Sequence, residues 1–221
     1  MKLSEEMKNN TLLSFELVPP KTEKGLQNLP GTIDHLMKYN PSYISCTYGA
    51  GGGNVGANRE VCQMIKNAGT TPVTHFTVIK NTKEGIKEQL DQYLADGVDH
   101  MLALRGDIPL GETTTCGDFD YATDLVKFVR DTYGDKFEIA VAGSPEGHIS
   151  CRSLESDIAV LKQKQDNGAD YIMTQLCWDM EQFKYWLDAI RKAGITMPVD
   201  VGVMPILDQA ATINMALSRN G

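Results

Sequence analysis

Short runs of β-branched and aliphatic residues recur along the chain about 30 residues apart, and polar or amphipathic segments separate them. Several runs, such as ISCTYG, MLALRG and EIAVAG, are apolar on both faces, which is typical of parallel strands covered by helices. Each gap has room for a helix. We therefore expect seven strands, over residues 13–19, 43–49, 72–79, 100–106, 138–144, 171–177 and 198–205.

Two of the intervening segments, 82–96 and 179–191, have the periodicity of a helix with one apolar face. Each also begins with the residue types of a capping box, in which an N-cap side chain and the side chain three residues later bond to each other's backbone N–H. The predicted pairs are Asn81 with Glu84 and Asp179 with Gln182. The similar segments ADGVDH and DNGADY place Gly97 and Gly168 where a helix would end in a left-handed residue.

Alternating strands and helices form either an open doubly wound sheet or a closed barrel. In a barrel the carboxyl ends of all strands meet at one mouth, whereas an open sheet gathers its polar residues near one switch point. Here nearly every predicted strand has polar residues at its carboxyl-terminal side, which favours the barrel. These residues are Glu16, Thr47, Tyr48, His75, Arg105, Asp107, Glu146, His148 and Gln175.

We therefore predict an α/β fold, a parallel (βα)8 TIM-type barrel that forms a single domain over residues 1–221. Such a barrel has eight strands and about 250 residues. This chain has 221 residues and stops just after a seventh predicted helix, at 209–219. We expect it to be C-terminally incomplete, without the eighth strand and helix.

Two acidic residues at predicted strand ends are candidates for chemistry. Glu16 lies in the apolar segment SFELVPP, where burial would raise the pKa of its carboxyl group and prepare it to donate a proton. The alternative is an ion pair with Arg105 or a lysine. Asp107 follows Arg105 and Gly106, and the glycine would let a ligand approach the backbone. The alternative is a local pair between Arg105 and Asp107.

The loop GAGGGNVG, residues 49–56, contains the spacing G-x-G-x-x-G. In dinucleotide-binding folds this spacing is accompanied by an acidic residue that holds a ribose hydroxyl. The next predicted strand, 72–79, ends without one. A mobile glycine-rich loop at the barrel mouth is the better interpretation.

The overall composition excludes several classes of function. The formal net charge is −8 and the cations do not cluster, which argues against nucleic-acid or anionic-membrane partners. Neither a membrane-length apolar run nor a signal peptide is evident, so we expect a cytoplasmic location. The five cysteines contain no CxxC pair, and His148, Cys151 and Cys177 are too few and too dispersed for a metal site. We expect reduced thiols and no metal.

Taken in order, eight segments resemble the methylenetetrahydrofolate reductase family, and the resemblance covers essentially the whole chain. Each motif is weak alone, but the set in this order is highly specific. The segments are SFELVPPK (14–21), TYGAGG (47–52), THFT (74–77), ALRGD (103–107), YATDLV (121–126), AGSPEGH (142–148), TQLCWD (174–179) and GVMPI (202–206).

The resemblance implies a barrel that holds a flavin at its mouth, FAD or, since Ser144 stands where many members have a tyrosine, FMN. NAD(P)H would reduce the flavin and leave, and methylenetetrahydrofolate would take its place and be reduced to methyltetrahydrofolate in a ping-pong cycle. The alternative is a truncated, non-catalytic barrel that binds flavin or folate, or a subunit. As further partners we consider a second copy of the chain, in a homo-oligomer, or a partner subunit.

The resemblance also assigns roles to individual positions. Glu16 matches the general acid, and Asp107 matches an acid between flavin and pterin. Gln175 matches the amide that binds pterin or nicotinamide, and Thr47 matches a nicotinamide contact. The positions that match flavin contacts are Tyr48, Ala50, His75, Arg105, Gly106, Asp107, Tyr121, Ala122, His148, Asp157 and Lys164.

Overall fold

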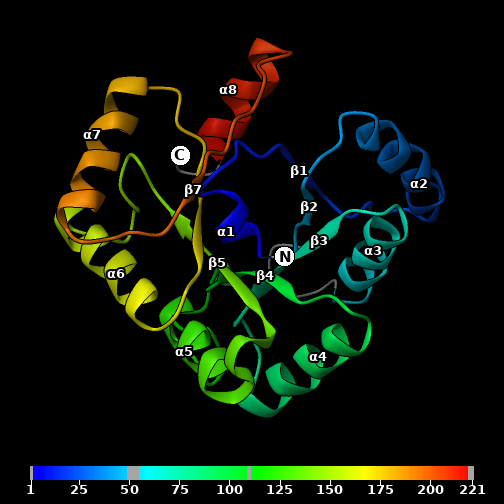
Figure 1. Ribbon diagram of the computed structural model, residues 1–221, viewed down its shortest axis with the longest axis horizontal. Helices are drawn as coiled ribbons and strands as arrows, with labels where there is room; N and C mark the ends of the chain where they lie inside the picture. The colour runs from blue at the N-terminus through cyan, green and yellow to red at the C-terminus, as the bar shows by residue number, and fades with distance from the viewer. Residues whose placement is uncertain (1, 49–54, 109–110, 219–221) are drawn as a thin grey trace.

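The strands form one parallel sheet whose order in space is their order in the sequence. The computed structural model describes residues 2–48, 55–108 and 111–218. Within these ranges the sheet has seven strands, curled so that helices surround it (Figure 1), and the predicted β/α barrel architecture is confirmed. The strands are β1 (Ser14–Leu17), β2 (Tyr43–Cys46), β3 (Thr71–Thr77), β4 (His100–Leu104), β5 (Glu138–Gly143), β6 (Tyr171–Thr174) and β7 (Val199–Asp200).

Helices follow the strands and cover the outside of the curled sheet. In Figure 1 they form a ring around the strands, with the short first helix at the centre. None of the helices within the described ranges is long and apolar enough to cross a membrane. The helices are α1 (Leu3–Glu6), α2 (Glu23–Met37), α3 (Val55–Asn67), α4 (Lys83–Ala95), α5 (Ala122–Tyr133), the 3₁₀ turn η1 (Gly134–Lys136), α6 (Leu154–Asp166), α7 (Met180–Lys192) and α8 (Gln209–Ser218).

Alternation along the strands separates an outer layer from an inner one. Residues such as Ile44, Phe76 and Val141 face outward and pack with the helices in the main core, which includes the fully buried Trp186. Their neighbours in sequence face the barrel interior, where a smaller apolar cluster lies. This inner cluster consists of Leu3, Tyr43, Val73, Leu102, Ala140 and Tyr171.

The two edge strands, β1 and β7, approach each other through side chains of the inner layer. The Ser14 hydroxyl donates a hydrogen bond of 3.2 Å to Asp200 Oδ2, across 186 positions of sequence. The Tyr43 hydroxyl donates to the same oxygen. Asp200 therefore joins the last strand to the first two and holds the sheet in its curled form.

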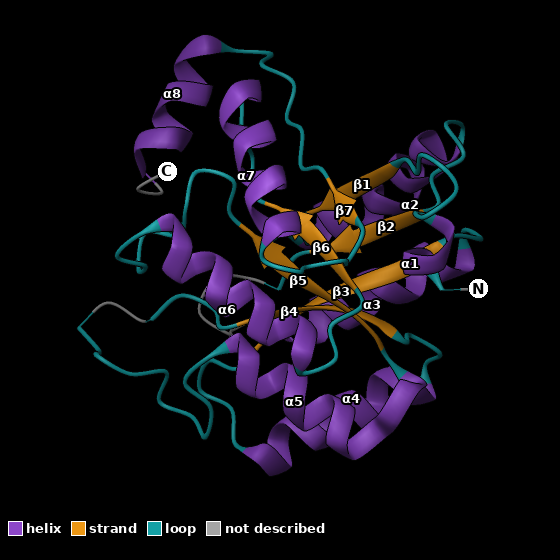
Figure 2. Cartoon of the chain, turned by 60° about the vertical axis from the view of Figure 1, so that its left-hand side comes forward, coloured by secondary structure: helices purple, strands orange, loops and turns teal. Residues whose placement is uncertain are grey.

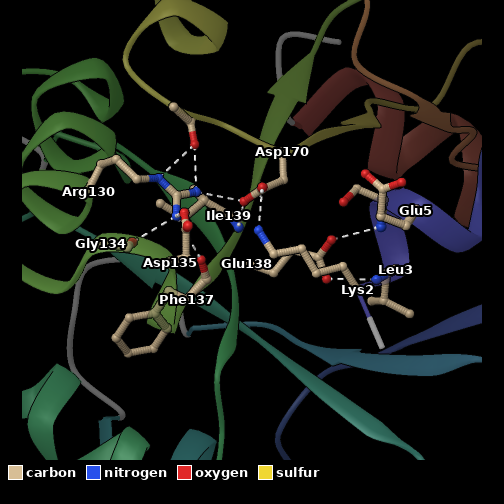
Figure 3. Close-up of polar contacts among 12 residues, drawn as sticks. Lys2, Leu3, Glu5, Arg130, Gly134, Asp135, Phe137, Glu138, Ile139 and Asp170 are labelled. Carbon is tan, nitrogen blue, oxygen red and sulfur yellow. Dashed lines mark hydrogen bonds and ion pairs between the residues drawn. The ribbon is translucent and has the colours of Figure 1, made fainter.

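The amino-terminal end of the barrel is plugged by α1, as Figure 3 shows in detail. The Glu138 carboxylate accepts hydrogen bonds of 2.7 Å from the backbone N–H groups of Leu3 and Ser4. Lys2 lies 3.3 Å from Asp170, which also accepts a 2.7 Å hydrogen bond from Arg130. The first residues of the chain thus close the floor and leave the opposite end as the mouth. In Figure 2, α1 lies at the right-hand end of the strands and the loops after them project to the left.

Several predicted boundaries are corrected. The strands end one to five residues earlier than predicted, because the chain leaves the regular strand soon after residues such as Leu17, Cys46 and Leu104 and turns into loops. The N-cap of α4 is Thr82, whose hydroxyl accepts from the Gly85 N–H, and not Asn81. Gly97 and Gly168 have φ values of +69° and +104°, so both predicted left-handed glycines are confirmed.

Only half of the second predicted capping box forms. The Asp179 carboxylate caps α7 by accepting from the N–H groups of Glu181 and Gln182. The Gln182 side chain does not return to the cap, because it donates to the Pro145 carbonyl at 2.8 Å. It thereby ties α7 to the loop after β5.

Candidate active site at the barrel mouth

The predicted site residues follow the carboxyl ends of successive strands, and the parallel sheet brings these ends to one side of the molecule. Backbone hydrogen bonds extend the ladder a little beyond the strands: the Thr47 N–H donates to Leu17 O at 2.9 Å, and the Gln175 N–H donates to Gly143 O at 2.8 Å. Thr47 and Gln175 are thereby fixed at the rim. The Gln175 side chain is exposed there.

Glu16 lies on β1, paired in register with Ser45 of β2. Its side chain is exposed, so the expectation of a carboxylate buried in an apolar segment is wrong. The reason is the position of β1 at the edge of the sheet, where β2 is its one strand neighbour in the described ranges. Because Ser14 reaches Asp200 from the inner face of β1, alternation places Glu16 on that face as well.

Four polar atoms on the inner wall are buried without a hydrogen-bond partner in the described structure: Ser45 Oγ, His75 Nε2 and Thr77 Oγ1 on the adjacent strands β2 and β3, and Tyr171 Oη on β6. These residues are at most 7% exposed. Burial lowers the pKa of His75 to about 4, so its imidazole is neutral at neutral pH. Buried polar groups are nearly always bonded. Three unsatisfied atoms on adjacent strands therefore mark a wall suited to a polar ligand.

Tyr48 is buried, and its hydroxyl donates to Gln89 of α4 at 2.7 Å. Its ring packs against Phe76 with 5.7 Å between ring centroids. Burial raises the pKa of Tyr48 to about 12, so the hydroxyl stays protonated. The side chain thus has a structural role between β3 and α4.

The segment Arg105–Gly106–Asp107 leaves β4 in a tight turn. Gly106 has φ +86°, and a Cβ there would lie 2.9 Å from Ile79 Cγ1. Glycine is therefore needed for the turn against β3, whether or not a ligand approaches. Arg105 Nε donates to the Gly106 carbonyl at 3.4 Å, and no ion pair links Arg105 with Asp107 within the described ranges. The Asp107 side chain is exposed at the mouth.

The loop after β5 and helix α6 form a linked polar cluster. Asp157 accepts from the His148 backbone N–H at 3.2 Å and from Cys151 Sγ at 3.6 Å. Lys164 Nζ donates to the Ala142 carbonyl at 3.1 Å. Burial lowers the pKa of Lys164, and the Asp157 charge opposes that shift. Three predicted flavin contacts, His148, Asp157 and Lys164, are thus placed together.

The other predicted contacts lie nearer the periphery or outside the described residues. Tyr121 is the N-cap of α5, with an exposed side chain and a backbone N–H that donates to Asp124 at 3.0 Å. Ala122 begins that helix. Ala50 and the glycine-rich segment 49–54 fall outside the described residues, so the predicted mobile loop stays a prediction.

The described residues contain no group of three or more His, Cys, Asp or Glu side chains arranged to hold a metal ion. Two shallow hollows on the outer surface lie over α4 and between α6 and α7. Both are lined by helix residues and not by the strand ends, and the candidate site is identified by the chemistry of the strand ends.

The family comparison decides the assignment. The sequence model of methylenetetrahydrofolate reductase matches residues 2–218. The chain belongs to the methylenetetrahydrofolate reductase family. Methylenetetrahydrofolate reductase (NADH) 1 of Arabidopsis thaliana is 37% identical over 219 residues, and the match covers 93% of this chain and 37% of that protein. The 5,10-methylenetetrahydrofolate reductase of Escherichia coli is 33% identical, over 91% of this chain and 67% of that protein. The chain thus spans little more than a third of its plant relative.

Solved structures show the same fold at low identity. A protein from Clostridium thermocellum that binds two copies of 5-methyl-5,6,7,8-tetrahydrofolic acid superposes with a TM-score of 0.73 at 14% identity, covering 99% of this chain and 75% of that one. A 2,3-dimethylmalate lyase superposes with a TM-score of 0.62 at 12% identity, covering 98% and 82%. At these identities the likeness supports the barrel fold alone.

Within this reductase-family barrel, sequence reasoning missed the inner-wall residues Ser45, Thr77 and Asp200. Ser45 and Thr77 lie two positions from Tyr43 and His75 on strands predicted as apolar, and the alternation could have pointed to them. Asp200 is an acid within the apolar segment PVDVGV. An isolated carboxylate in such a segment is a signal of the kind that drew attention to Glu16.

Proposed function

We propose that this chain catalyses the reduction of 5,10-methylenetetrahydrofolate to 5-methyltetrahydrofolate with NAD(P)H, using a flavin in a ping-pong cycle. The main support is the family match over residues 2–218, together with the arrangement of its motif residues at one end of a parallel barrel. The five cysteines are free thiols, as a reducing compartment would keep them, and we propose a cytoplasmic location.

The inner wall suits a flavin, FAD in the first instance and FMN as the alternative. An isoalloxazine ring carries carbonyl and ring-nitrogen groups along one polar edge, and the unsatisfied atoms of Ser45, His75 and Thr77 offer partners for such an edge. Lys164 supplies a cation beside the loop after β5. A bound flavin would supply a two-electron carrier between NAD(P)H and the folate.

The remaining residues that match flavin contacts would act at the rim of the barrel. We propose that Arg105, Tyr121 and His148 contact the flavin's polar chain, since all three lie on loops that follow strands of the same sheet. Asp157 would orient this region through its hydrogen bonds to His148 and Cys151. Tyr48, Ala122 and Gly106 would contact the flavin through packing and through their backbone groups.

Glu16 would act on the folate as general acid. Before the one-carbon bridge can accept hydride, one of its carbon–nitrogen bonds must break, and the departing nitrogen needs a proton. Glu16 lies on the inner face of an edge strand, with its side chain exposed and able to reach a substrate. A positioned acid contributes roughly 10²–10⁴ in rate. Asp107 would stabilise the cation left on the bridge, Gln175 would bind the pterin or nicotinamide amide edge, and Thr47 would contact the nicotinamide.

The decisive experiment begins with the absorption spectrum of the purified protein. A flavin spectrum that NADH bleaches under anaerobic conditions, and that methylenetetrahydrofolate then restores in stoichiometric amount, would support the proposal. A colourless protein that takes up neither FAD nor FMN would contradict it. A protein that binds flavin but passes no hydride to folate would be the non-catalytic barrel, alone or as a subunit.

A further inference from the structure

The side chain of Asn58, which lies near the start of α3, is completely buried and fully hydrogen-bonded. Its amide nitrogen donates to the backbone carbonyls of Cys46 at 2.9 Å and Thr47 at 3.1 Å. Its amide oxygen accepts from the hydroxyls of Thr74 at 2.8 Å and Tyr93 at 2.7 Å. Backbone carbonyls can only accept, so these partners fix the orientation of the amide. A buried amide bound in this way is a rigid support.

Both carbonyls lie where β2 ends and the chain enters the mouth. Successive carbonyls of an extended strand point to opposite neighbouring strands, so two of them can meet one amide only where the strand bends. Asn58 therefore binds the bend between Cys46 and Thr47. Tyr43 and Ser45 face the barrel interior, and alternation gives Thr47 the same direction. The bend thus sets where the Thr47 hydroxyl lies on the inner face.

The rest of the backbone around Thr47 is held by other elements. Its N–H donates to the Leu17 carbonyl at 2.9 Å, which ties it to β1. The next residue, Tyr48, is anchored by its hydroxyl to Gln89 of α4 at 2.7 Å. The Thr47 carbonyl has a second contact, from Cys46 Sγ at 3.8 Å, but a thiol is a weak donor. The buried amide is therefore the main support on the carbonyl side of Thr47.

We propose that Asn58 is a positioning residue, whose buried amide holds the Thr47 backbone so that the Thr47 hydroxyl meets the nicotinamide of NAD(P)H in a fixed place. A residue that must be ordered when a ligand binds costs conformational entropy, and fixing it beforehand raises the affinity. For the backbone of one residue this corresponds to about ten-fold in the dissociation constant. The inference rests on the proposed function for the identity of the ligand, whereas the support of the Thr47 backbone does not depend on it.

The first test measures the Thr47 backbone without a ligand, by nitrogen NMR relaxation of the full chain. Asn58→Asp keeps the size of the side chain and an acceptor oxygen but replaces both N–H donors with a second oxygen. The order parameter of Thr47 should fall from about 0.85, the value of a rigid backbone, toward about 0.6, while that of Ile44 in β2 stays high. A Thr47 whose order parameter and Cα chemical shift both match the wild type would overturn the proposal. If Asn58→Asp does not fold, Asn58→Ala is measured with the same expectation.

The second test measures the affinity of the FAD-loaded protein for NADH during anaerobic reduction of the flavin. Thr47→Val and Asn58→Asp should each raise the dissociation constant of NADH about ten-fold and lower the limiting rate much less. Because Asn58 acts through Thr47, the double variant should also lose about ten-fold, whereas independent effects would multiply to about a hundred-fold. Reoxidation of the flavin by methylenetetrahydrofolate should be affected less than the binding of NADH.

Tyr133→Phe is the matched control, because it removes a buried hydroxyl of α5 that donates to Asp91 of α4 at 2.8 Å. It should lower the melting temperature and leave the dissociation constant of NADH within about two-fold of the wild type. Independent effects in the double variant, or an equal loss in the folate half-reaction, would show that Asn58 is merely structural and would overturn the proposal. If NADH does not reduce the flavin of the wild type, the proposed function fails, and the order parameters alone decide whether Asn58 holds the Thr47 backbone.

Discussion

His100 Nε2 lies 2.9 Å from Glu138 Oε2 at the floor of the barrel. The angles of this contact are not those of a hydrogen bond, and Nε2 has no other hydrogen-bond partner in the described residues. The contact is therefore an ion pair. On its other side the ring contacts Asp99 at 2.7 Å. Glu138 also binds the first turn of α1. A single buried carboxylate thus links strand β4, strand β5 and the N-terminal plug.

Glu138→Gln should destabilise the protein by about 3 kcal/mol, because a buried network loses its charge while its donors remain. The variant leaves His100 beside a neutral amide and weakens two backbone hydrogen bonds of α1. Urea unfolding near pH 6 measures the effect. Glu88→Gln on the exposed side of α4 is the matched control and should change the stability by less than about 0.5 kcal/mol. Equal effects of the two substitutions would show that the floor network contributes nothing.

The same contacts predict how stability depends on pH. Burial alone would lower the pKa of His100, but Asp99 and Glu138 more than offset it and raise it to about 9. A pKa raised above the unfolded value of 6.5 means that this contribution is complete below pH 6.5 and is lost as the pH rises through 9. Unfolding free energies at pH 6, 7.5 and 9 should therefore decline, and the decline should be smaller in His100→Gln. Parallel curves for the two proteins would contradict the assignment.

At low pH the contribution of Glu138 to stability depends on pH in the opposite direction. Burial would raise its pKa, but contacts from His100 and from the Ser4 and Leu3 backbone lower it to about 2. Its contribution is present above pH 4.5 and is lost as the pH falls through 2. The floor network should consequently be strongest between about pH 4.5 and 6.5.

The beginnings of strands could be predicted well from the sequence and their ends poorly. Tyr43, His100, Glu138 and Tyr171 are the first residues of both the predicted and the observed strands. Hydrophobic runs begin where burial begins, but some continue past the paired residues, as Val18 does after β1 and Val78 and Ile79 do after β3. The strand β7 shows the limit, with two residues paired out of eight predicted.

Features that depend on distant partners were not predictable. Neither the plug formed by α1 nor the seam at Asp200 has a local signal, since their partners lie 134 to 186 positions away. The sequence alone also does not distinguish Thr82 from Asn81 as the N-cap, because both residue types cap helices well. Glu16 was correctly placed on the first strand, but its exposure depends on the absence of a strand neighbour on that side within the described sheet.

Glu16→Gln should keep flavin reduction by NADH near the wild-type rate and reduce folate turnover by at least about 100-fold, the lower end of what a general acid contributes. The amide retains the size of the side chain and cannot donate an acidic proton. Anaerobic stopped-flow absorbance measures the two half-reactions separately. Glu88→Gln again serves as control. A parallel fall of both half-reactions would mean that Glu16 supports the site without acting as acid.

Asp107→Asn should weaken folate binding and slow hydride transfer to it, since the negative charge that would stabilise the cationic bridge is gone. The side chain is exposed and has no ion pair with Arg105, so the substitution should leave the melting temperature within about 2 °C. Titration of folate into the reduced protein gives the affinity. Unchanged binding and unchanged rates would remove Asp107 from the site.

His75→Leu separates a ligand-binding role from a packing role by the sign of its effect on the stability of the flavin-free protein. The buried Nε2 has no partner in the described structure, and an unsatisfied polar atom costs about 1–3 kcal/mol. Leucine removes that cost, so the flavin-free protein should be as stable as the wild type or more so, while flavin affinity should fall about ten-fold for one lost hydrogen bond.

Thr74→Val is the matched control on the outer face of the same strand, where the hydroxyl donates to Asn58 at 2.8 Å. It should lower stability by about 1 kcal/mol and leave flavin affinity unchanged. Denaturant unfolding without flavin and fluorescence titration with it measure both quantities. If His75→Leu behaved like Thr74→Val, the histidine would belong to the core and not to the cofactor site.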